Sequence, residues 1–250
     1  MFKLSSLIYV ILLPITAAAQ PIQGLYISGA TGVNFLDTLQ SSQATTRIDT
    51  GAGPMGLGAV GWGFGEGLRA EIEGSYRSSD IGGISTRRVN GALLPLTDTS
   101  GNAGTSAVMV NVDYDIPVQP LGLPIQPYIG GGVGYGWLDF GNAGGNGFAK
   151  FNLPHHNTFS SPDLVSYGSG GALAYQAIIG ASLPLSMLPG LDFTLEYRFF
   201  GTERTDIPVS RVSTVGTSVN GAIPSSHARN GFEVHDNAIA FGVRYAFGAL

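Results

Sequence analysis

The chain has 250 residues, including 38 glycines, 14 prolines and no cysteine, and only 12% of its residues are charged. Lysines and arginines form no basic cluster and the net charge is −5, so a nucleic-acid partner is not expected. The lack of cysteine excludes disulfides, thiolate metal sites and a cysteine nucleophile. Beyond the N-terminus no apolar run approaches the roughly 20 residues of a membrane helix, so helical membrane spans are not expected.

The first segment has the layout of a secretory signal peptide. Lys3 precedes an apolar run from Leu4 to Ile15, and Ala17-Ala18-Ala19 forms a small-residue cleavage site. We therefore expect residues 1–19 to be a signal peptide that is cleaved after Ala19, and residues 20–250 to be the exported domain. A single membrane anchor is the less favoured alternative, because Pro14 interrupts a run that is already short.

The rest of the chain alternates apolar with small or polar residues, which is the period of β-strands. In the segment 68–78, Ile72 and Tyr76 share one face with other apolar residues, while Arg69, Glu71 and Arg77 share the other. The same pattern predicts eight strands, near residues 24–35, 54–64, 68–78, 105–116, 127–140, 171–183, 191–200 and 235–247.

The gaps between these strands alternate in length. Residues 36–53, 79–104, 141–170 and 201–234 form four long gaps rich in small polar residues, whereas residues 65–67, 117–126 and 184–190 form short gaps rich in glycine and proline. Long connections at one end and tight turns at the other predict an all-β, eight-stranded antiparallel up-and-down barrel. Both termini should lie at the end with the short turns.

A membrane barrel and a soluble barrel of the ligand-carrier type share this alternation, so other features must separate them. Strands of about ten residues match a tilted membrane span. Outward aromatic residues fall into two levels, as membrane interfaces favour. The loop-side level holds Phe35, Tyr76, Trp137, Tyr197 and Phe199, and the turn-side level holds Trp62, Phe64, Tyr114, Tyr245 and Phe247. With the low total charge, these features favour a transmembrane barrel with four long extracellular loops and short periplasmic turns.

Three stretches resemble the small OmpA-like and Opa-like outer-membrane barrel proteins of Gram-negative bacteria. They are the glycine-rich run from Pro127 to Gly136, the strand from Leu195 to Phe199 and the ending from Phe241 to Phe247. The resemblance covers essentially the whole mature chain, and it implies a bacterial outer-membrane location with lipid and lipopolysaccharide around the barrel. It also implies that the barrel-assembly machinery recognises the last strand through the alternating residues Phe241, Val243, Tyr245 and Phe247. We expect the chain to end at the barrel, without a peptidoglycan-binding domain.

Eight strands leave a lumen that side chains can fill. We expect inward charged residues to pair with one another, because an unpaired buried charge costs several kcal/mol. We call the following nine residues the interior network: Arg69, Glu71, Glu73, Arg77, Asp113, Asp115, Glu196, Arg198 and Arg244. The inward glycines 130, 132, 134 and 136 are expected to make room for long Arg and Glu side chains from other strands, with a narrow pore beside them as the alternative.

The resulting functional hypothesis is a non-enzymatic barrel without cofactor, catalytic or metal site, whose extracellular loops give it a structural or surface-interaction role, as an adhesin or antigen. A host or surface ligand would then bind the loops. A porin-like channel for small solutes along the interior charges is the alternative. An outer-membrane lipid hydrolase comes third, because the sequence contains neither G-x-S-x-G nor H-E-x-x-H.

Overall fold

The computed structural model describes residues 22–41, 46–87, 93–95, 97–117, 125–148, 151–153, 156–159, 162–213 and 226–247. Nearly all of these residues lie in β-strands. No helix in these ranges is long and apolar enough to cross a membrane.

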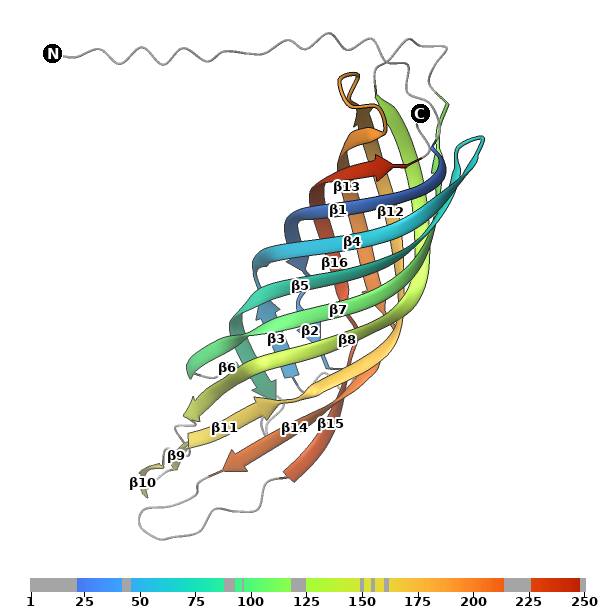
Figure 1. Cartoon of the computed structure of the whole chain (residues 1–250). Helices are drawn as coiled ribbons and strands as arrows, with labels where there is room; N and C mark the ends of the chain where they lie inside the picture. Colours follow the sequence, from blue (N-terminus) through green and yellow to red (C-terminus); the bar gives the residue numbers. More distant parts are fainter. Residues whose placement is uncertain are drawn as a thin grey trace, which may run out of the picture.

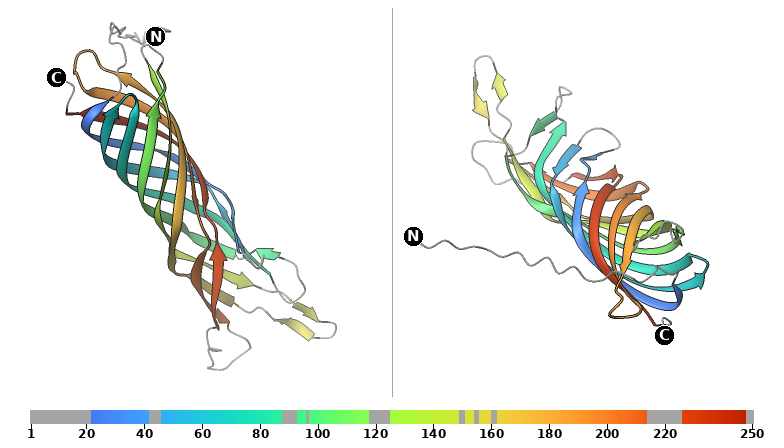
Figure 2. Two further views of the ribbon diagram at one scale, coloured as in Figure 1. Left: turned by 90° about the vertical axis from the view of Figure 1, so that its right-hand side faces the viewer. Right: turned by 90° about the horizontal axis from the view of Figure 1, so that it is seen from above.

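Eight long strands form a closed antiparallel ring (Figures 1 and 2). Each strand pairs with its sequence neighbour in the ring, and the last strand pairs with both the seventh and the first. The strands are β1 (Gln23–Leu36), β4 (Ala52–Gly65), β5 (Leu68–Arg87), β7 (Thr97–Asp115), β8 (Gln126–Phe148), β12 (Ser169–Pro184), β13 (Leu191–Thr202) and β16 (His235–Ala246). This arrangement confirms the predicted eight-stranded up-and-down barrel.

The described ends of the chain lie at the turn end of the barrel, as expected. The Phe247 backbone N–H donates to the Leu25 carbonyl at 2.9 Å, which holds the residue after β16 beside the start of β1. At the same end, Gly65-Glu66-Gly67 joins β4 to β5, with positive φ at all three residues. Glycine on both sides of Glu66 allows the tight reversal that the turn requires.

The long connections differ from the prediction, because much of their length is β-structure rather than loop. Strands β5, β7 and β8 run past the predicted ends of their segments, and further strands continue the wall of the ring. We call this part of the molecule the extension. Its further strands are β2 (Leu39–Gln40), β3 (Thr46–Thr50), β6 (Leu93–Pro95), β11 (Pro162–Tyr167), β14 (Thr205–Ser213) and β15 (Ser226–Phe232). A separate small hairpin joins β9 (Phe151–Leu153) to β10 (His156–Phe159).

The small polar residues of these connections obscured a real alternation. In β3, Ile48 is fully buried, while Arg47 is exposed and forms an ion pair with Asp49 at 2.8 Å. A strand that already pairs with its neighbour can satisfy further backbone groups simply by continuing. Pairing therefore extends the barrel wall through segments whose composition favours loops.

The outer face of the ring is apolar. Ile72, Val133 and Ile179 have exposed fractions of 63, 68 and 62%. All ten aromatic residues predicted for the two levels point outward, with Phe199 half-buried against Tyr175 and His235. Such a surface requires lipid rather than water around it.

The pattern inverts in the extension, where apolar side chains point inward. They form a cluster that we call the extension core, consisting of Leu36, Leu39, Ile48, Ile81, Ile84, Leu138, Phe140, Ile207, Phe232 and Val234. Phe140 and Phe232 pack with their ring centroids 5.9 Å apart. Apolar residues inside and charged residues outside are typical of a β-structure in water, so the extension lies beyond the lipid-facing band.

Candidate functional site: the charged barrel interior

The structure places all nine residues of the interior network inside the ring. Eight are buried, and Glu196 is mostly buried, with 11% of its side chain exposed. They come from β5, β7, β13 and β16, on the strand face opposite the lipid-facing residues. Alternation along each strand is sufficient to explain this placement.

Arg198 is the centre of the largest group of contacts. Its Nη1 lies 2.7 Å from Glu73 Oε2, and its Nε lies 2.6 Å from Glu196 Oε2. Glu196 also accepts a hydrogen bond from the Tyr128 hydroxyl. One guanidinium thus links carboxylates from β5 and β13 across the lumen, which is the geometry a buried charge needs.

The Glu71 carboxylate is joined to this group through the side-chain amides of Asn111 and Gln176. Asn111 Nδ2 donates to Glu71 Oε1 and to Glu73 Oε2, at 2.9 Å each. Gln176 Nε2 donates to Asn111 Oδ1 at 2.6 Å, and the Tyr26 hydroxyl donates to Glu71 Oε2 at 3.0 Å. Glu71 is therefore held by neutral donors rather than by an arginine.

A second group of charges lies nearer the turn end. Arg69 Nη2 lies 3.2 Å from Asp115 Oδ1 and 3.8 Å from Asp113 Oδ2. The Arg69 and Arg244 guanidinium carbons lie 4.8 and 5.1 Å from the centroid of the Tyr128 ring. Among the described residues no carboxylate lies within ion-pair distance of Arg244. The expectation of complete mutual pairing is thus wrong at Arg244, where aromatic faces take the place of a carboxylate.

The third group lies toward the extension and centres on Arg77. Its guanidinium carbon is 4.3 Å from the centroid of the Phe200 ring, and its Nε is 3.8 Å from Asp236 Oδ1. Asn34 Nδ2 donates to Asp236 Oδ2 and to Ser79 Oγ, both at 2.8 Å. Phe200 also belongs to the buried apolar cluster that continues into the extension, so Arg77 lies where charged contacts give way to apolar packing.

The predicted interior network left out the neutral residues of the lumen and the acid Asp236, although the polar parity of the strands includes Asn111 and Asp236. Asp236 has the same inward parity as Arg244 on β16, and this parity was the available signal. The neutral members have no charge to draw attention to them, although they share the inward face. The missed residues are Tyr26, Asn34, Asn111, Tyr128, Gln176 and Asp236.

The inward glycines of β8 make room for neighbouring side chains, but the side chains differ from those expected. A Cβ at Gly130 would lie 1.8 Å from Asp113 Oδ1, and one at Gly132 would lie 2.0 Å from Asn111 Oδ1. A Cβ at Gly134 would lie 2.8 Å from Met109 Sδ. At these three glycines the space is taken by residues directly opposite on β7, and a Cβ at Gly136 would lie 3.3 Å from Phe200 and Thr202 of β13. No long Arg or Glu side chain is among these nearest neighbours.

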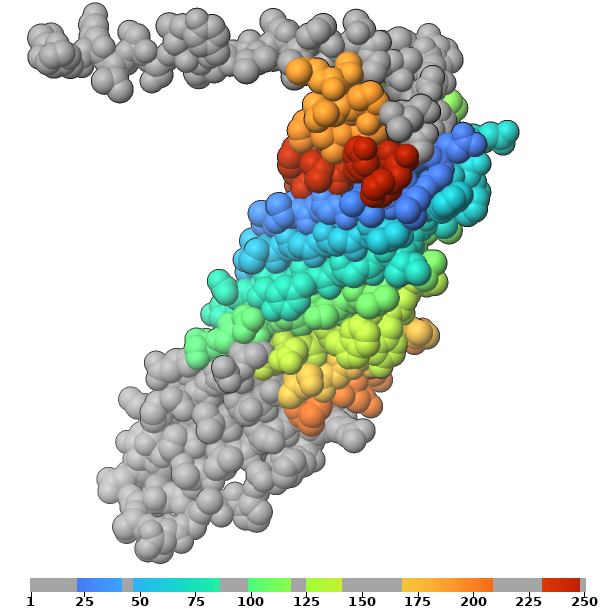
Figure 3. All heavy atoms as spheres, viewed as in Figure 1, coloured from blue at the N-terminus to red at the C-terminus, as the bar shows by residue number. Residues whose placement is uncertain are grey.

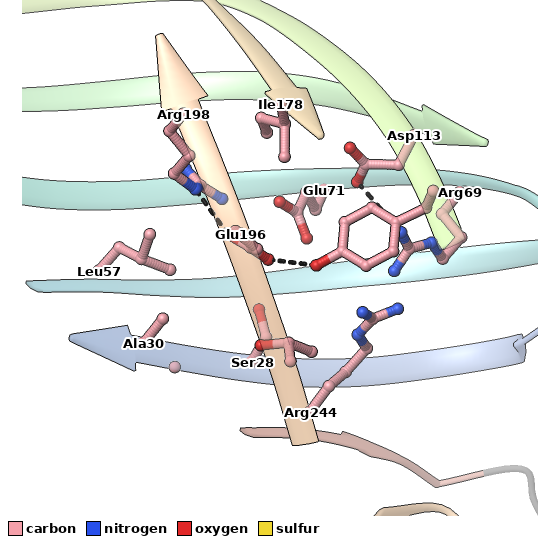
Figure 4. Close-up of a pocket in the computed structure, with 13 residues that line it drawn as sticks. Ser28, Ala30, Leu57, Arg69, Glu71, Asp113, Ile178, Glu196, Arg198 and Arg244 are labelled. Atoms are coloured by element: carbon pink, nitrogen blue, oxygen red, sulfur yellow. Dashed lines mark hydrogen bonds and ion pairs between the residues drawn. The ribbon is translucent and has the colours of Figure 1, made fainter. Parts of the chain in front are cut away.

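A small cavity of about 10 Å³, room for about one water molecule, lies within the interior. Figure 4 shows Glu71, Glu196, Arg198 and Arg244 around this space. Its lining also includes the hydroxyl residues Ser28 and Thr194. The lining thus combines ion-paired side chains such as Arg198 with Glu71 and Arg244, which form no ion pair among the described residues.

The chain matches a family model described as the outer membrane protein beta-barrel domain over residues 5–247. An outer membrane protein of Gluconacetobacter diazotrophicus is 32% identical over 254 aligned residues, covering 94% of this chain. This chain spans 60% of the length of that relative.

Two solved structures of similar shape are Neisserial surface protein A and OprG from Pseudomonas aeruginosa. The first is 13% identical with a TM-score of 0.48, over 91% of this chain and 100% of its own. The second is 14% identical with a TM-score of 0.45, over 90% of this chain and 98% of its own. At these values the likeness carries no argument about activity.

Of the other expectations, the signal peptide and its cleavage after Ala19 lie outside the described residues. The residues expected to guide assembly do lie together: Phe241, Val243 and Tyr245 point outward along β16, and Phe247 follows with its ring centroid 5.1 Å from that of Tyr245. Their recognition by the assembly machinery stays a prediction. Because the family model matches nearly the whole chain, this chain belongs to the outer membrane protein beta-barrel family and is a protein of the bacterial outer membrane.

Proposed function

We propose that this protein is a closed, non-enzymatic barrel that presents its extension to the outside of the cell, in a structural or surface-interaction role of the adhesin or antigen kind. The observation that carries the proposal is the filling of the lumen by the interior network. The extension then offers the working surface, and lipid and lipopolysaccharide surround the band below it.

The interior network opposes solute passage because most of its charges are ion-paired with one another. Arg198 joins β13 to β5 through Glu73 within the lumen, and Asn111 joins the carboxylates of Glu71 and Glu73. A solute would have to break these contacts while they remain desolvated, which costs several kcal/mol for each buried charge left unpaired.

The extension core is a second feature that supports the same proposal. Ile48, Ile84 and Phe232 are almost completely buried within the extension. Apolar packing gives ions and small polar solutes no favourable contacts. A path through the barrel would therefore have to cross both a charged and an apolar region.

The extension is also suited to recognition. Its strands continue the hydrogen-bonded wall of the barrel, so the residues 88–92 and 214–225 join strand ends that the wall holds in place. Binding surfaces are commonly loops carried by such a rigid scaffold. We infer that a host or surface ligand would bind there.

The small-solute channel remains the second candidate function, because a polar cavity does lie within the lumen. The hydrolase hypothesis has weaker support. Of the histidines, His235 has a described side chain, and it stacks on Phe199 on the outer face rather than joining a polar cluster.

The deciding experiment is single-channel recording of the refolded protein in planar lipid bilayers. A boiled and unboiled gel comparison confirms that the barrel has formed. We expect no reproducible openings from the folded protein, and openings only when both regions are altered, as in Glu73→Ala combined with Phe232→Ala. Regular openings of the unmodified protein would favour the channel instead.

A second experiment tests the surface role. Replacing residues 88–92 or 214–225 by short Gly-Ser linkers leaves the described strands intact. Deleting the whole predicted loop 79–104 would instead remove strand segments of β5 and β7. We expect folding to persist while attachment of cells to surfaces or envelope integrity declines; unchanged attachment and integrity in both variants would contradict the display role.

A further inference from the structure

The turn between β12 and β13 exposes apolar side chains at the periplasmic end of the barrel. Met187 has an exposed fraction of 73% and Leu188 one of 56%. Met187 is the most exposed large apolar residue among the described side chains. From Leu183 to Leu191 the sequence contains no charged residue.

The turn has a fixed shape because its backbone is hydrogen-bonded. The Leu188 N–H donates to the Leu185 carbonyl at 3.1 Å, and the Leu191 N–H donates to the Leu188 carbonyl at 3.0 Å. Pro189 and Gly190 occupy the centre of the second reversal, where a φ of 88° at Gly190 suits a type II turn. The exposed side chains are thus held on an ordered turn.

The turn lies next to the lipid-facing band. Leu191 pairs with Tyr245, a member of the turn-side aromatic level, and the Ala246 N–H donates to the Gly190 carbonyl at 2.8 Å. Met187 and Leu188 therefore lie within a few residues of Leu191, which pairs with the aromatic level that marks the membrane interface. In Figure 3 the turn, in orange, projects beyond the end of β16, in red.

The turn between β4 and β5 provides a comparison at the same end of the barrel. It follows Phe64, another member of the turn-side aromatic level, and its tip is the exposed, charged Glu66. A charged tip suits contact with water, whereas Met and Leu at a tip suit contact with apolar groups. The two turns at one end of the barrel therefore have different preferred surroundings.

We propose that the turn between β12 and β13 enters the interface of the inner leaflet, where Met187 and Leu188 contact phospholipid. The proposal rests on the outer-membrane location and not on the surface role. Three features support it: the continuity of the turn with the lipid-facing band, its lack of charge and the hydrogen bonds that pair the backbone N–H groups of Leu185, Leu188 and Leu191. Satisfied backbone groups lower the cost of leaving water, and exposed apolar side chains gain from entering the headgroup and acyl boundary.

The natural absence of cysteine allows a direct test with single labels. Met187→Cys and, as the matched control, Glu66→Cys are each labelled with the environment-sensitive fluorophore NBD. The refolded proteins are placed in vesicles of phosphatidylethanolamine and phosphatidylglycerol. We expect the label at position 187 to emit at shorter wavelength, to be quenched by lipid-borne doxyl groups and to be several-fold less accessible to iodide than the label at position 66.

Equal iodide access at the two positions, without doxyl quenching at 187, would overturn the proposal and leave the turn as a periplasmic surface. Gel mobility before and after boiling establishes that each labelled barrel is folded. Leu188→Cys gives a second site on the same turn in case Met187→Cys refolds poorly, and the same pattern is expected there. Because these measurements do not depend on conductance or on a surface ligand, failure here is distinct from failure of the proposed function.

Discussion

Replacing Glu73 by Gln tests whether ion pairing holds the barrel interior together. The Glu73 side chain is fully buried, and its Oε2 accepts from Arg198 Nη1 at 2.7 Å, from Asn111 Nδ2 at 2.9 Å and from Gln176 Nε2 at 3.4 Å. Glutamine keeps the size of the side chain and removes its charge. The substitution therefore isolates the electrostatic part of these contacts.

The expected loss follows from what remains around Arg198. Removing one partner of a buried ion pair costs about 3–5 kcal/mol. Arg198 keeps Glu196, whose Oε2 lies 2.6 Å from Nε, so we expect Glu73→Gln to lower the free energy of unfolding by about 2–3 kcal/mol. Combining it with Arg198→Met removes both charges, and the double variant should be less destabilised than the sum of the single variants.

The assay is urea unfolding of the refolded barrel in detergent micelles. Trp62 and Trp137, which lie in the two aromatic levels, report unfolding by fluorescence, and gel mobility reports loss of the barrel. Glu66→Gln on the exposed turn is the matched control and should change stability by less than about 0.5 kcal/mol. If Glu73→Gln proves as stable as this control, the ion pairs do not stabilise the barrel and the reasoning is refuted.

Three further substitutions test other parts of the structure. Glu71→Ala leaves the Tyr26 hydroxyl and an Asn111 N–H without their acceptor, so thermal stability in detergent should fall by about 1–3 kcal/mol; unchanged melting would count against the network. Gly134→Ala places a Cβ 2.0 Å from the Val108 backbone carbonyl oxygen and should destabilise the barrel in the same urea assay, whereas Gly74→Ala meets no atom within 4 Å and should be tolerated; equal stability of the two would show that the interior adapts freely. Phe232→Ala removes a fully buried ring from the extension core and should cost about 3–5 kcal/mol locally, measured as faster external proteolysis of intact cells with the barrel still folded; unchanged cleavage would contradict the packing.

The sequence was sufficient for the barrel and for the face that each strand turns to the lumen. Alternation of apolar and polar residues is a local property, and it placed Arg69, Glu73 and Arg198 inside the ring without knowledge of the neighbouring strands. The order of long and short gaps gave the antiparallel arrangement. The same local signal was too weak in the connections, where small polar residues concealed strands such as β3 and β14.

The contacts inside the lumen could not be predicted in this way. Which carboxylate each arginine meets depends on the stagger of strands around the closed ring and on the rotamers that the filled lumen permits. Only the tertiary structure shows that Arg198 reaches Glu73 on the far wall, that Arg244 faces tyrosine rings instead of an acid, and that the glycines of β8 admit Asp113 and its neighbours on β7. The sequence by itself determined which residues face inward, because that depends on position along one strand. The pairing among them was decided by closure, because closure alone brings distant strands within reach of one another.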